Sequence, residues 1–283
     1  MKIINKTMDR NDLKTKKALA IADELNNLIR ELQSRKLKIS SWFGRFNLTG
    51  DKFERIMRGY NYKPLEGAAD DNNFPWFKYW EIAWIVSNNN FQPESTVLDL
   101  GGSSSLFSFY LASRGLNVTT IDIRDVLTKN ADYVAKKMGW KLRNFTMDMT
   151  NMHFTEKFDN ITSLCVFEHL QKSDRIHTIR TIRDLLADGG HFSITFDFGI
   201  NQIETPADVH EQFVRPSGLQ VRGNQTFVDN GKRYLLHPFY YRPWSWKLKA
   251  SYILYGNDRL SKLRELFKTK ENNDFTFGAL FQE

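Results

Sequence analysis

The sequence has little cysteine and no long apolar run. Cys165 is the single cysteine among 283 residues, which excludes an internal disulfide framework and a zinc site built from cysteines. No stretch approaches the roughly 18 apolar residues that a membrane-spanning helix needs, and no apolar run follows the charged opening residues. We therefore predict an intracellular, cytoplasmic protein without a membrane span.

Histidine patterning gives no sign of a metal site. The six histidines form no pair at positions i and i+4 with a helical carboxylate, which is the spacing of a common metal-binding motif. We therefore predict no bound metal.

The overall composition is that of a folded protein. Hydrophobic residues make up 41% of the chain, charged residues 26% and aromatic residues 14%, which excludes disorder, collagen and coiled coil as descriptions of the whole chain. At this length we expect one core of ordinary domain size with appended segments.

The net charge of +7 lies in two segments. Residues 1–40 contain ten basic and five acidic side chains and residues 241–270 contain eight and two, so the rest of the chain carries −4. Lys and Arg that neutralise phosphates would favour nucleic acid as a partner. Because the excess lies outside the central segment, we interpret it more narrowly, as a sign that an acceptor molecule or its carrier is anionic.

Helical patterns dominate the first 90 residues. Apolar residues recur at helical spacing over 11–34 and again over 73–86, where the apolar face is rich in aromatic residues. We interpret residues 1–90 as a helical, aromatic-rich N-terminal extension that caps the core. Trp76 or Tyr79, near the start of the second helix, is an alternative candidate for lining a ligand pocket.

Strand and helix patterns alternate from residue 96 onwards. Short apolar strands are predicted at 96–100, 117–123, 145–148, 160–167 and 191–196, with helices between most of them. This alternation predicts a parallel sheet that is buried on both faces. We assign the core to 91–236, a basic aromatic insertion that covers the substrate to 237–274, and a last core strand to 275–283.

One hairpin is also predicted near the end of the core. Asn230-Gly231 is the residue pair that a two-residue hairpin turn requires, so residues 219–227 are expected to pair with 233–236.

Polar residues follow four of the predicted strands where each strand ends. They are Asp99 with Gly101-Gly102-Ser103, then Asp122, then Asp148, and finally the segment 163–169. Ligands of open parallel sheets bind at the carboxyl ends of the strands, so these residues are expected to share one site. The G-x-G-x-x-G motif that binds a diphosphate is absent, and Asp99 would repel such a group, which disfavours a nicotinamide cofactor.

Five segments resemble, in order and spacing, the motifs of class I S-adenosylmethionine-dependent methyltransferases. They are residues 97–105, 118–122, 147–149, 158–170 and 185–190. The resemblance implies a Rossmann-like seven-stranded sheet, mostly parallel with an antiparallel last strand, and helices on both faces. It also implies methyl transfer from S-adenosylmethionine, with S-adenosylhomocysteine as the product.

The same resemblance implies which residues bind the cofactor. Asp99 would contact the methionine amino end directly or through water, Asp122 would hold the ribose hydroxyls, and the backbone near Cys165 would face the sulfonium. The other implied cofactor residues are Gly101, Gly102, Ser103, Ile123, Asp148 and Met149. The loop departs from the family where Ser103 and Ser105 replace frequent glycines, and their hydroxyls could bond the cofactor carboxylate.

The sequence leaves the catalytic residues open. Methyl transfer from a sulfonium requires a well-placed acceptor, and it requires a base only where the acceptor must lose a proton. Glu168, His169 and His210 are the candidate bases. Cys165 lies in an apolar strand, where a thiol is a poor nucleophile.

The acceptor is also left open. Asn/Asp-Pro-Pro-Tyr/Phe, which marks family members that act on amide or base nitrogens, is absent. We expect a small-molecule or saccharide-type (glycan) acceptor that is methylated on O or N. An RNA methyltransferase and a non-catalytic S-adenosylmethionine-binding protein are the alternatives, and the sequence does not define the oligomeric state.

Overall fold

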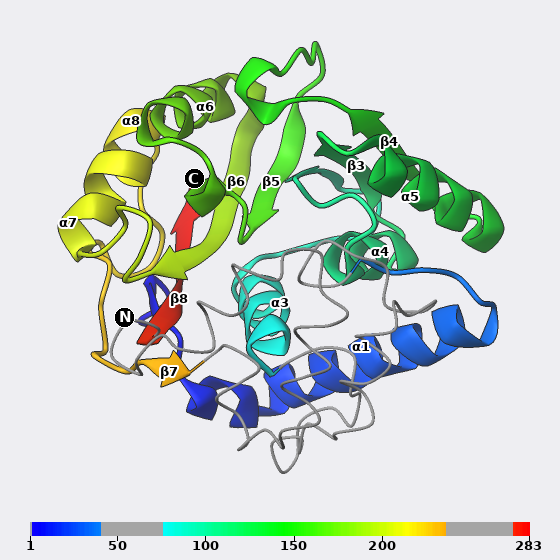
Figure 1. Cartoon of the computed structure of the whole chain (residues 1–283), viewed down its shortest axis with the longest axis horizontal. Helices are drawn as coiled ribbons and strands as arrows, with labels where there is room; N and C mark the ends of the chain where they lie inside the picture. The colour runs from blue at the N-terminus through cyan, green and yellow to red at the C-terminus, as the bar shows by residue number, and fades with distance from the viewer. Residues whose placement is uncertain (1, 41–75, 236–273) are drawn as a thin grey trace, which may run out of the picture.

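The structure is a computed structural model that describes residues 2–40, 76–235 and 274–283. Almost all of the predicted insertion at 237–274 lies outside these residues. The described strands form one sheet in the order β1-β8-β6-β5-β2-β3-β4, and β7 pairs with β8 off this path (Figure 1). The strands are β1 (Lys6–Thr7), β2 (Thr96–Leu100), β3 (Asn117–Asp122), β4 (Leu142–Thr146), β5 (Phe158–Leu164), β6 (Leu186–Phe198), β7 (Tyr234–Leu235) and β8 (Asp274–Gln282).

The pairing directions agree with the predicted fold class. β2, β3, β4, β5 and β6 run parallel to their neighbours in this group, whereas β8 is antiparallel to β6. The short strand β1 is in turn antiparallel to β8. The predicted N-terminal extension therefore adds a strand to the sheet as well as helices.

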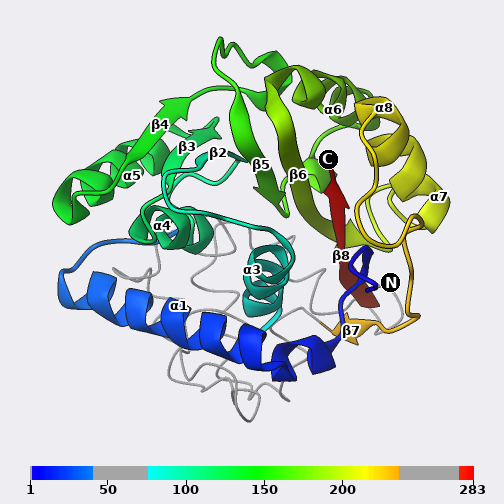
Figure 2. The ribbon, with the colours of Figure 1, turned by 180° about the vertical axis from the view of Figure 1, so that it is seen from behind.

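Helices cover both faces of the sheet. One face carries α1 (Lys16–Ser34), α3 (Trp76–Asn88), α4 (Leu106–Ser113) and α5 (Asp125–Met138), and the other carries α6 (Lys172–Leu185), α7 (Pro206–Val209) and α8 (Arg215–Ser217) (Figures 1 and 2). Short turns of helix are η1 (Arg10–Lys14), η2 (Met149–Asn151), η3 (Phe167–His169) and η4 (His210–Val214). None of the helices in the described part of the chain is long and apolar enough to cross a membrane.

Each strand contributes to two apolar cores because successive side chains of a strand point to opposite faces. Val97 packs in the core under α1, α3 and α4, whereas its neighbour Leu98 packs in the core under α6. This explains why the strands are buried on both faces, with Thr119, Thr120 and Thr162 buried beside the apolar residues.

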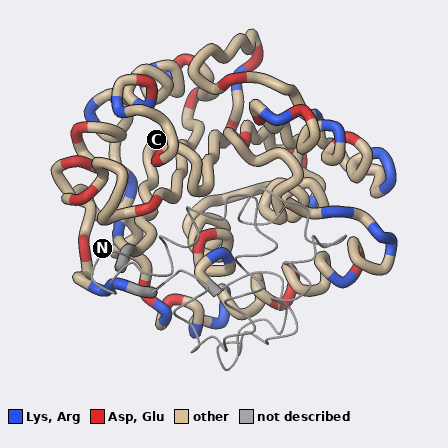
Figure 3. The backbone as a smooth tube through the Cα atoms, viewed as in Figure 1, with Lys and Arg blue, Asp and Glu red and all other residues tan. Residues whose placement is uncertain are grey.

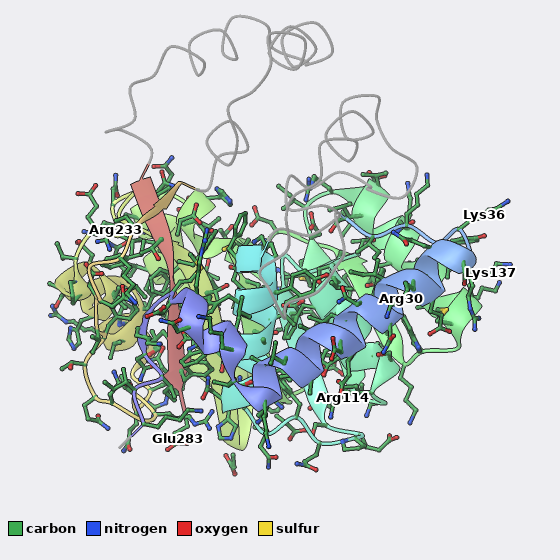
Figure 4. All side chains as sticks on the ribbon, turned by 90° about the horizontal axis from the view of Figure 1, so that it is seen from below. Arg30, Lys36, Arg114, Lys137, Arg233 and Glu283 are labelled. Atoms are coloured by element: carbon green, nitrogen blue, oxygen red, sulfur yellow. The ribbon has the colours of Figure 1, made fainter. Side chains whose placement is uncertain are left out.

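The helix α3 is held by its aromatic side chains. Phe77 stacks on Phe277 of β8 with ring centroids 5.3 Å apart, and Trp80 stacks on Trp84 at 5.8 Å. Tyr79 is buried, and its hydroxyl donates to Asn26 Oδ1 of α1 at 2.6 Å. Tyr79 therefore packs between helices, and the suggestion that it lines a ligand pocket is not supported. Figure 4 shows α1 crossing this side of the molecule, with Arg30 and Lys36 toward its far end.

The predicted hairpin between 219–227 and 233–236 is wrong. Tyr234 and Leu235 pair with Phe275 and Asp274 at the start of β8. The segment near Val221 instead runs beside the end of β8, where Arg222 N donates to Phe281 O at 2.9 Å. Asn-Gly pairs favour a turn at that position, but they do not decide which strand the flanking residues pair with.

Asn5 ties β1 to the rest of the sheet. Its side chain is fully buried, accepts from Phe281 N at 2.8 Å, and donates to Asn224 O at 2.8 Å and Arg222 O at 2.5 Å. Asn224 reciprocates, since its Oδ1 accepts from Ile4 N and Asn5 N at 2.8 and 2.9 Å. These bonds join segments more than 200 residues apart.

Asn5→Ala is expected to lower the free energy of unfolding by about 3 kcal/mol, because it leaves buried donors and acceptors without partners. Urea unfolding of both proteins measures this difference. Asn11→Ala, at an exposed position, is the matched control and should change stability by less than about 0.5 kcal/mol. Equal losses in the two variants would contradict this role for Asn5.

Candidate functional site

The loops that follow the parallel strands meet at one edge of the sheet. Gly101 N donates to Ile121 O at 2.9 Å, which joins the loop after β2 to the end of β3. Met147 N donates to Asp122 O at 3.0 Å, and Cys165 N donates to Thr195 O at 3.0 Å, which extend the same edge to β4 and β6. The nine predicted cofactor residues lie in these loops or at the ends of the strands before them: Asp99, Gly101, Gly102, Ser103, Asp122, Ile123, Asp148, Met149 and Cys165.

The glycine loop lies directly on the carboxylate of Asp99. A Cβ at Gly102 would be 1.8 Å from Asp99 Oδ2, so this position has no room for a side chain. Asp99 is 1% exposed, and its carboxylate accepts from Ser108 Oγ at 2.5 Å and Thr162 Oγ1 at 3.0 Å. Asp99 thus supports the loop from beneath, and its predicted contact with the methionine end of the cofactor is not tested by this geometry.

The serines of the loop bond to the protein itself. Ser103 Oγ lies 2.6 Å from Thr120 Oγ1, and Ser105 caps α4 by accepting from Ser108 N at 3.0 Å. The suggested bonds from these hydroxyls to a cofactor carboxylate stay a prediction. The hydroxyls replace glycine flexibility with fixed hydrogen bonds.

The ends of β3 and β4 combine a fixed carboxylate with an open apolar surface. Asp122 is 6% exposed, and its Oδ1 accepts from Arg124 N at 2.9 Å. The next residue, Ile123, is 71% exposed, which is unusual for a large aliphatic side chain beside a site. Asp148 is exposed and Met149 is buried. A carboxylate next to an uncovered apolar side chain fits a ribose and a flat base, so these residues fit S-adenosylmethionine.

An acidic cluster lies at the ends of β5 and β6, in which Glu81 and Glu168 are buried and Cys165 and Asp197 are half-buried. It consists of Glu81 of α3, Cys165, Glu168 and Asp197, with Lys78 of α3 beside them. Cys165 Sγ donates to Glu81 Oε1 and lies 3.9 Å from Asp197 Oδ1. Lys78 Nζ pairs with Glu81 Oε2 at 2.7 Å. The ligand atoms of Cys165, Glu168 and Asp197 all lie within 4.8 Å of one another, a geometry that could also hold a metal ion.

Burial changes the protonation of this cluster. It raises the pKa of the Glu168 carboxyl well above its ordinary value, and the charge of Asp197 adds to the effect. It also raises the pKa of Asp197 to about 7, against the opposing charge of Lys78. The pKa of the Cys165 thiol rises through burial and the charge of Glu81. Burial alone would lower the pKa of Lys78, but the surrounding groups of Cys165, Glu81 and Asp197 outweigh it and raise this pKa.

A buried arginine shapes the loop that carries Glu168. Arg175 of α6 is 1% exposed, and its guanidinium donates to Phe167 O at 2.9 Å, Leu170 O at 3.0 Å and Glu168 O at 3.3 Å. It also donates to Gln212 Oε1. The planar guanidinium group of arginine carries several N–H donors in fixed directions, so it can bind several carbonyls of one tight turn. These hydrogen bonds stabilise η3.

The three candidate bases do not come together. Glu168 belongs to the acidic cluster and its side chain is fully buried, whereas the His169 side chain is 68% exposed, with Nε2 4.0 Å from Glu168 Oε1. His210 starts η4, on the face that α6 covers, and its exposed ring lies 3.4 Å from Glu211. Of the three, Glu168 is the one at the strand ends and inside the protein.

Lys78, Glu81 and Asp197 are site residues that the sequence analysis did not identify. Asp197 comes immediately after the predicted strand 191–196, so the rule that polar residues at strand ends form the site would have found it. The indication for Glu81 was weaker, since it is a carboxylate within a helix whose apolar face is rich in aromatic residues. No pattern in the sequence connects it to Cys165.

Asp99 predicts a pH dependence of stability. Burial raises its pKa to about 7 in the folded state, although the hydroxyls of Ser108 and Thr162 oppose this. In the unfolded chain the group ionises near pH 4. As the pH rises from about 4 to 7 the unfolded state loses this proton while the folded state keeps it, so folding becomes less favourable.

We therefore compare the free energy of unfolding of the unaltered protein with that of Asp99→Asn. The difference between the two should be most favourable to the unaltered protein at about pH 4 and below, and it should fall as the pH rises to about 7. Urea unfolding at pH 5 and pH 7.5 measures the change, and Glu168 and Asp197 are common to both proteins. Asp184→Asn, an exposed control on α6, should follow the unaltered protein. If the stability of Asp99→Asn changed with pH in the same way as that of the unaltered protein, Asp99 would not be the cause of the pH dependence.

Comparison with known proteins gives the same assignment as the motifs. Residues 97–190 match the family model described as a methyltransferase domain. A putative sarcosine dimethylglycine methyltransferase from Galdieria sulphuraria has a TM-score of 0.52 at 14% identity, over 72% of this chain and 83% of that one. The cyclase SpnF also has a TM-score of 0.52 at 14% identity, over 71% of this chain and 78% of that one. No curated protein sequence matches the chain. Residues 97–190 therefore match a methyltransferase domain, and the described residues have the fold of class I S-adenosylmethionine-dependent methyltransferases.

Proposed function

We propose that the chain methylates a small-molecule acceptor, with the acceptor atom placed against the acidic cluster. The observation that carries this proposal is the position of that cluster. Cys165 and Asp197 lie at the carboxyl ends of β5 and β6, on the edge where the glycine loop also lies. When bound, S-adenosylmethionine supplies a methyl group that its sulfonium has already activated.

The protein must hold the cofactor and exclude water from the reacting atoms. Asp122 is the residue proposed to accept hydrogen bonds from the ribose hydroxyls, and Ile123 would be covered by the base. The fixed loop at 101–105 would lie under the methionine end. Pre-formed geometry of this kind lowers the entropy cost of bringing donor and acceptor together.

A small acceptor fits the cluster better than a polyanion does. Buried carboxylates repel phosphates, and the cluster contains Glu81, Glu168 and Asp197 against Lys78 alone among its members. The Galdieria protein is described as acting on sarcosine and dimethylglycine, which are small molecules. The saccharide-type acceptor and the predicted anionic acceptor depend on the insertion at 237–274, almost all of it outside the described residues.

A protein that binds the cofactor without methylating anything stays the alternative from another class. SpnF has a similar fold, and its name describes it as a cyclase and not as a methyltransferase. The fold alone therefore does not decide the chemistry. Formation of S-adenosylhomocysteine from S-adenosylmethionine with an added acceptor distinguishes the two.

Asp122→Ala is expected to weaken the binding of S-adenosylhomocysteine roughly 30-fold, since loss of hydrogen bonds to a charged acceptor costs about 2 kcal/mol. Isothermal titration calorimetry measures this. Asp23→Ala on the exposed side of α1 is the control and should leave the affinity unchanged. Unaltered affinity in Asp122→Ala would place the ribose elsewhere.

The RNA alternative makes a separate prediction. Lys and Arg lie along α1 and α5, but Asp and Glu lie among them (Figure 3). Affinity for a single-stranded RNA should therefore be weak, and the slope of its logarithm against the logarithm of salt concentration should be near zero. Fluorescence anisotropy at 50 and 200 mM salt tests this. A steep negative slope with tight binding would favour RNA as the acceptor.

A further inference from the structure

We propose that the carboxylates of Glu168 and Asp197 bind the protonated amino group of the methyl acceptor and take up its proton, so that the chain methylates an amine nitrogen. This inference rests on the proposed methyl transfer and names the substrate class for the same site.

The first observation is that Glu168 is buried without a hydrogen-bond partner. Its side chain is fully buried, and neither carboxylate oxygen has a hydrogen-bond partner among the described residues. A buried carboxylate in this state costs several kcal/mol unless a donor or cation satisfies it. Its oxygens lie near those of Asp197 and the sulfur of Cys165, all within 4.8 Å. The side chain therefore points into the acidic cluster.

The second observation is the charge balance of the cluster. Lys78 Nζ pairs with Glu81 Oε2 at 2.7 Å, and Glu81 Oε1 accepts from Thr195 Oγ1 at 2.7 Å and from Cys165 Sγ. Glu81 is thus matched on both oxygens, and its charge balances Lys78. The two further carboxyl groups, Glu168 and Asp197, have raised pKa values because no second cation in the cluster offsets their burial. A further cation beside them would favour their ionised form and would itself be stabilised there.

Groups on every neighbouring element have to be counted in this balance. Arg175 of α6 directs its donors to the carbonyls of the η3 loop, and His169 lies 4.0 Å from Glu168 with an exposed ring. Burial, followed by the charges of Lys78 and Arg175, lowers the pKa of His169, which favours its neutral form. The charge of Arg175 does act on Glu168, but its guanidinium donates its hydrogen bonds to backbone carbonyls and to Gln212 and none to a cluster carboxylate.

The third observation connects the cluster to the cofactor loop. A Cβ at Gly101 would lie 2.7 Å from Val166 Cγ1, so the cofactor loop packs on the residue between Cys165 and η3. Cys165 has a φ of +52°, a strained backbone for a residue other than glycine, and its thiol points into the cluster. The loop expected to hold the methyl donor and the surplus carboxylates are therefore adjacent.

The chemistry needs a proton acceptor at this position. A protonated amine has no free lone pair, so its N–H bond must break and an O–H bond must form on a carboxylate. The lone pair then forms the N–C bond while the C–S bond of S-adenosylmethionine breaks, leaving S-adenosylhomocysteine and a methylated ammonium. The raised pKa of Glu168, and the pKa of Asp197 at about 7, suit a pair that accepts a proton near neutral pH.

The same ligand atoms could instead hold a divalent metal ion, and two features oppose that occupant. Lys78 already places an ammonium in the cluster, which repels a divalent ion about twice as strongly as a monovalent ammonium at the same distance. The raised pKa of Cys165 also favours the thiol over the thiolate that metals prefer. The metal is therefore an outcome of the test.

The test uses the full chain loaded with S-adenosylhomocysteine and two small probes of similar shape, ethylammonium chloride and ethanol, at matched ionic strength. Probes with so few atoms are expected to bind with dissociation constants of about millimolar or weaker, and ligand-observed NMR can measure such weak affinities. Ethylammonium is expected to bind and ethanol is not. Glu168→Gln and Asp197→Asn should each weaken ethylammonium by about tenfold while leaving S-adenosylhomocysteine affinity unchanged.

The matched controls carry the same chemical changes elsewhere. Glu94→Gln lies just before β2, at the opposite edge of the sheet, and its carboxylate is 67% exposed. Asp184→Asn is exposed on α6. Both should bind ethylammonium like the unaltered protein. The comparison of ethylammonium with ethanol on the unaltered protein stays decisive even if a cluster variant does not fold.

The outcomes separate the two proposals. If S-adenosylhomocysteine does not bind, the proposed function fails and this inference fails with it. If S-adenosylhomocysteine binds but ethylammonium does not, or binds no better than ethanol, methyl transfer stands and the amine inference is overturned. Tight binding of Zn²⁺ or Mn²⁺ that is lost in Glu168→Gln and Asp197→Asn would also overturn it, by assigning the cluster to a metal.

Discussion

The parallel pairing of β2 with β5 is the interaction on which the site depends. It sets Asp99 opposite Thr162, whose hydroxyl donates to the Asp99 carboxylate at 3.0 Å. One residue further, Ser163 Oγ donates to Leu100 O at 3.0 Å. Both loops consequently leave the sheet side by side, and Gly101 packs against Val166. A shift of one residue in this pairing would turn the Asp99 carboxylate to the other face of the sheet and remove the support of the glycine loop.

Arg175 and Glu168 are two buried ionisable groups near the site, and they differ in how far hydrogen bonds compensate their loss of hydration. Arg175 loses its hydration but donates to several carbonyls of one loop, so most of its donors are satisfied. Glu168 loses its hydration and gains no hydrogen-bond partner among the described residues. The first arrangement stabilises the fold, whereas the second is a cost that proteins accept mainly where a ligand restores the balance. The contrast separates a structural group from a group with a proposed role in binding.

The fold could be predicted from the sequence because its signals are local. Short segments rich in apolar residues indicated the parallel strands, and the acids that follow them indicated the edge of the sheet where a ligand is expected. The hairpin failed because the partner of a strand is chosen by distant residues of β8, which the Asn-Gly signal does not contain. The role of β1 was missed for the same reason, since two residues are too few to give a periodic pattern.

The acidic cluster could be predicted only in part. Glu168 followed a strand and was recognised as a candidate, and Asp197 was within reach of the same rule. Lys78 and Glu81 were not, because their helix packs across the sheet and meets Cys165, 84 positions from Glu81 along the chain. Helical periodicity finds the buried face of such a helix but cannot say which of its polar residues has a distant partner.

The position of α3 has a consequence for the modular use of this domain. The segment that matches the methyltransferase family, 97–190, contains Asp99, Asp122 and Glu168 but neither Glu81 nor Asp197. A chimera that exchanges only this segment with a methyltransferase would transfer Asp99 and Asp122, which are proposed to bind the cofactor, and would split the acidic cluster between two parents. On the proposed role of the cluster, exchange of acceptor preference would require α3 and the end of β6 to move together with the matched segment, although they flank it on opposite sides.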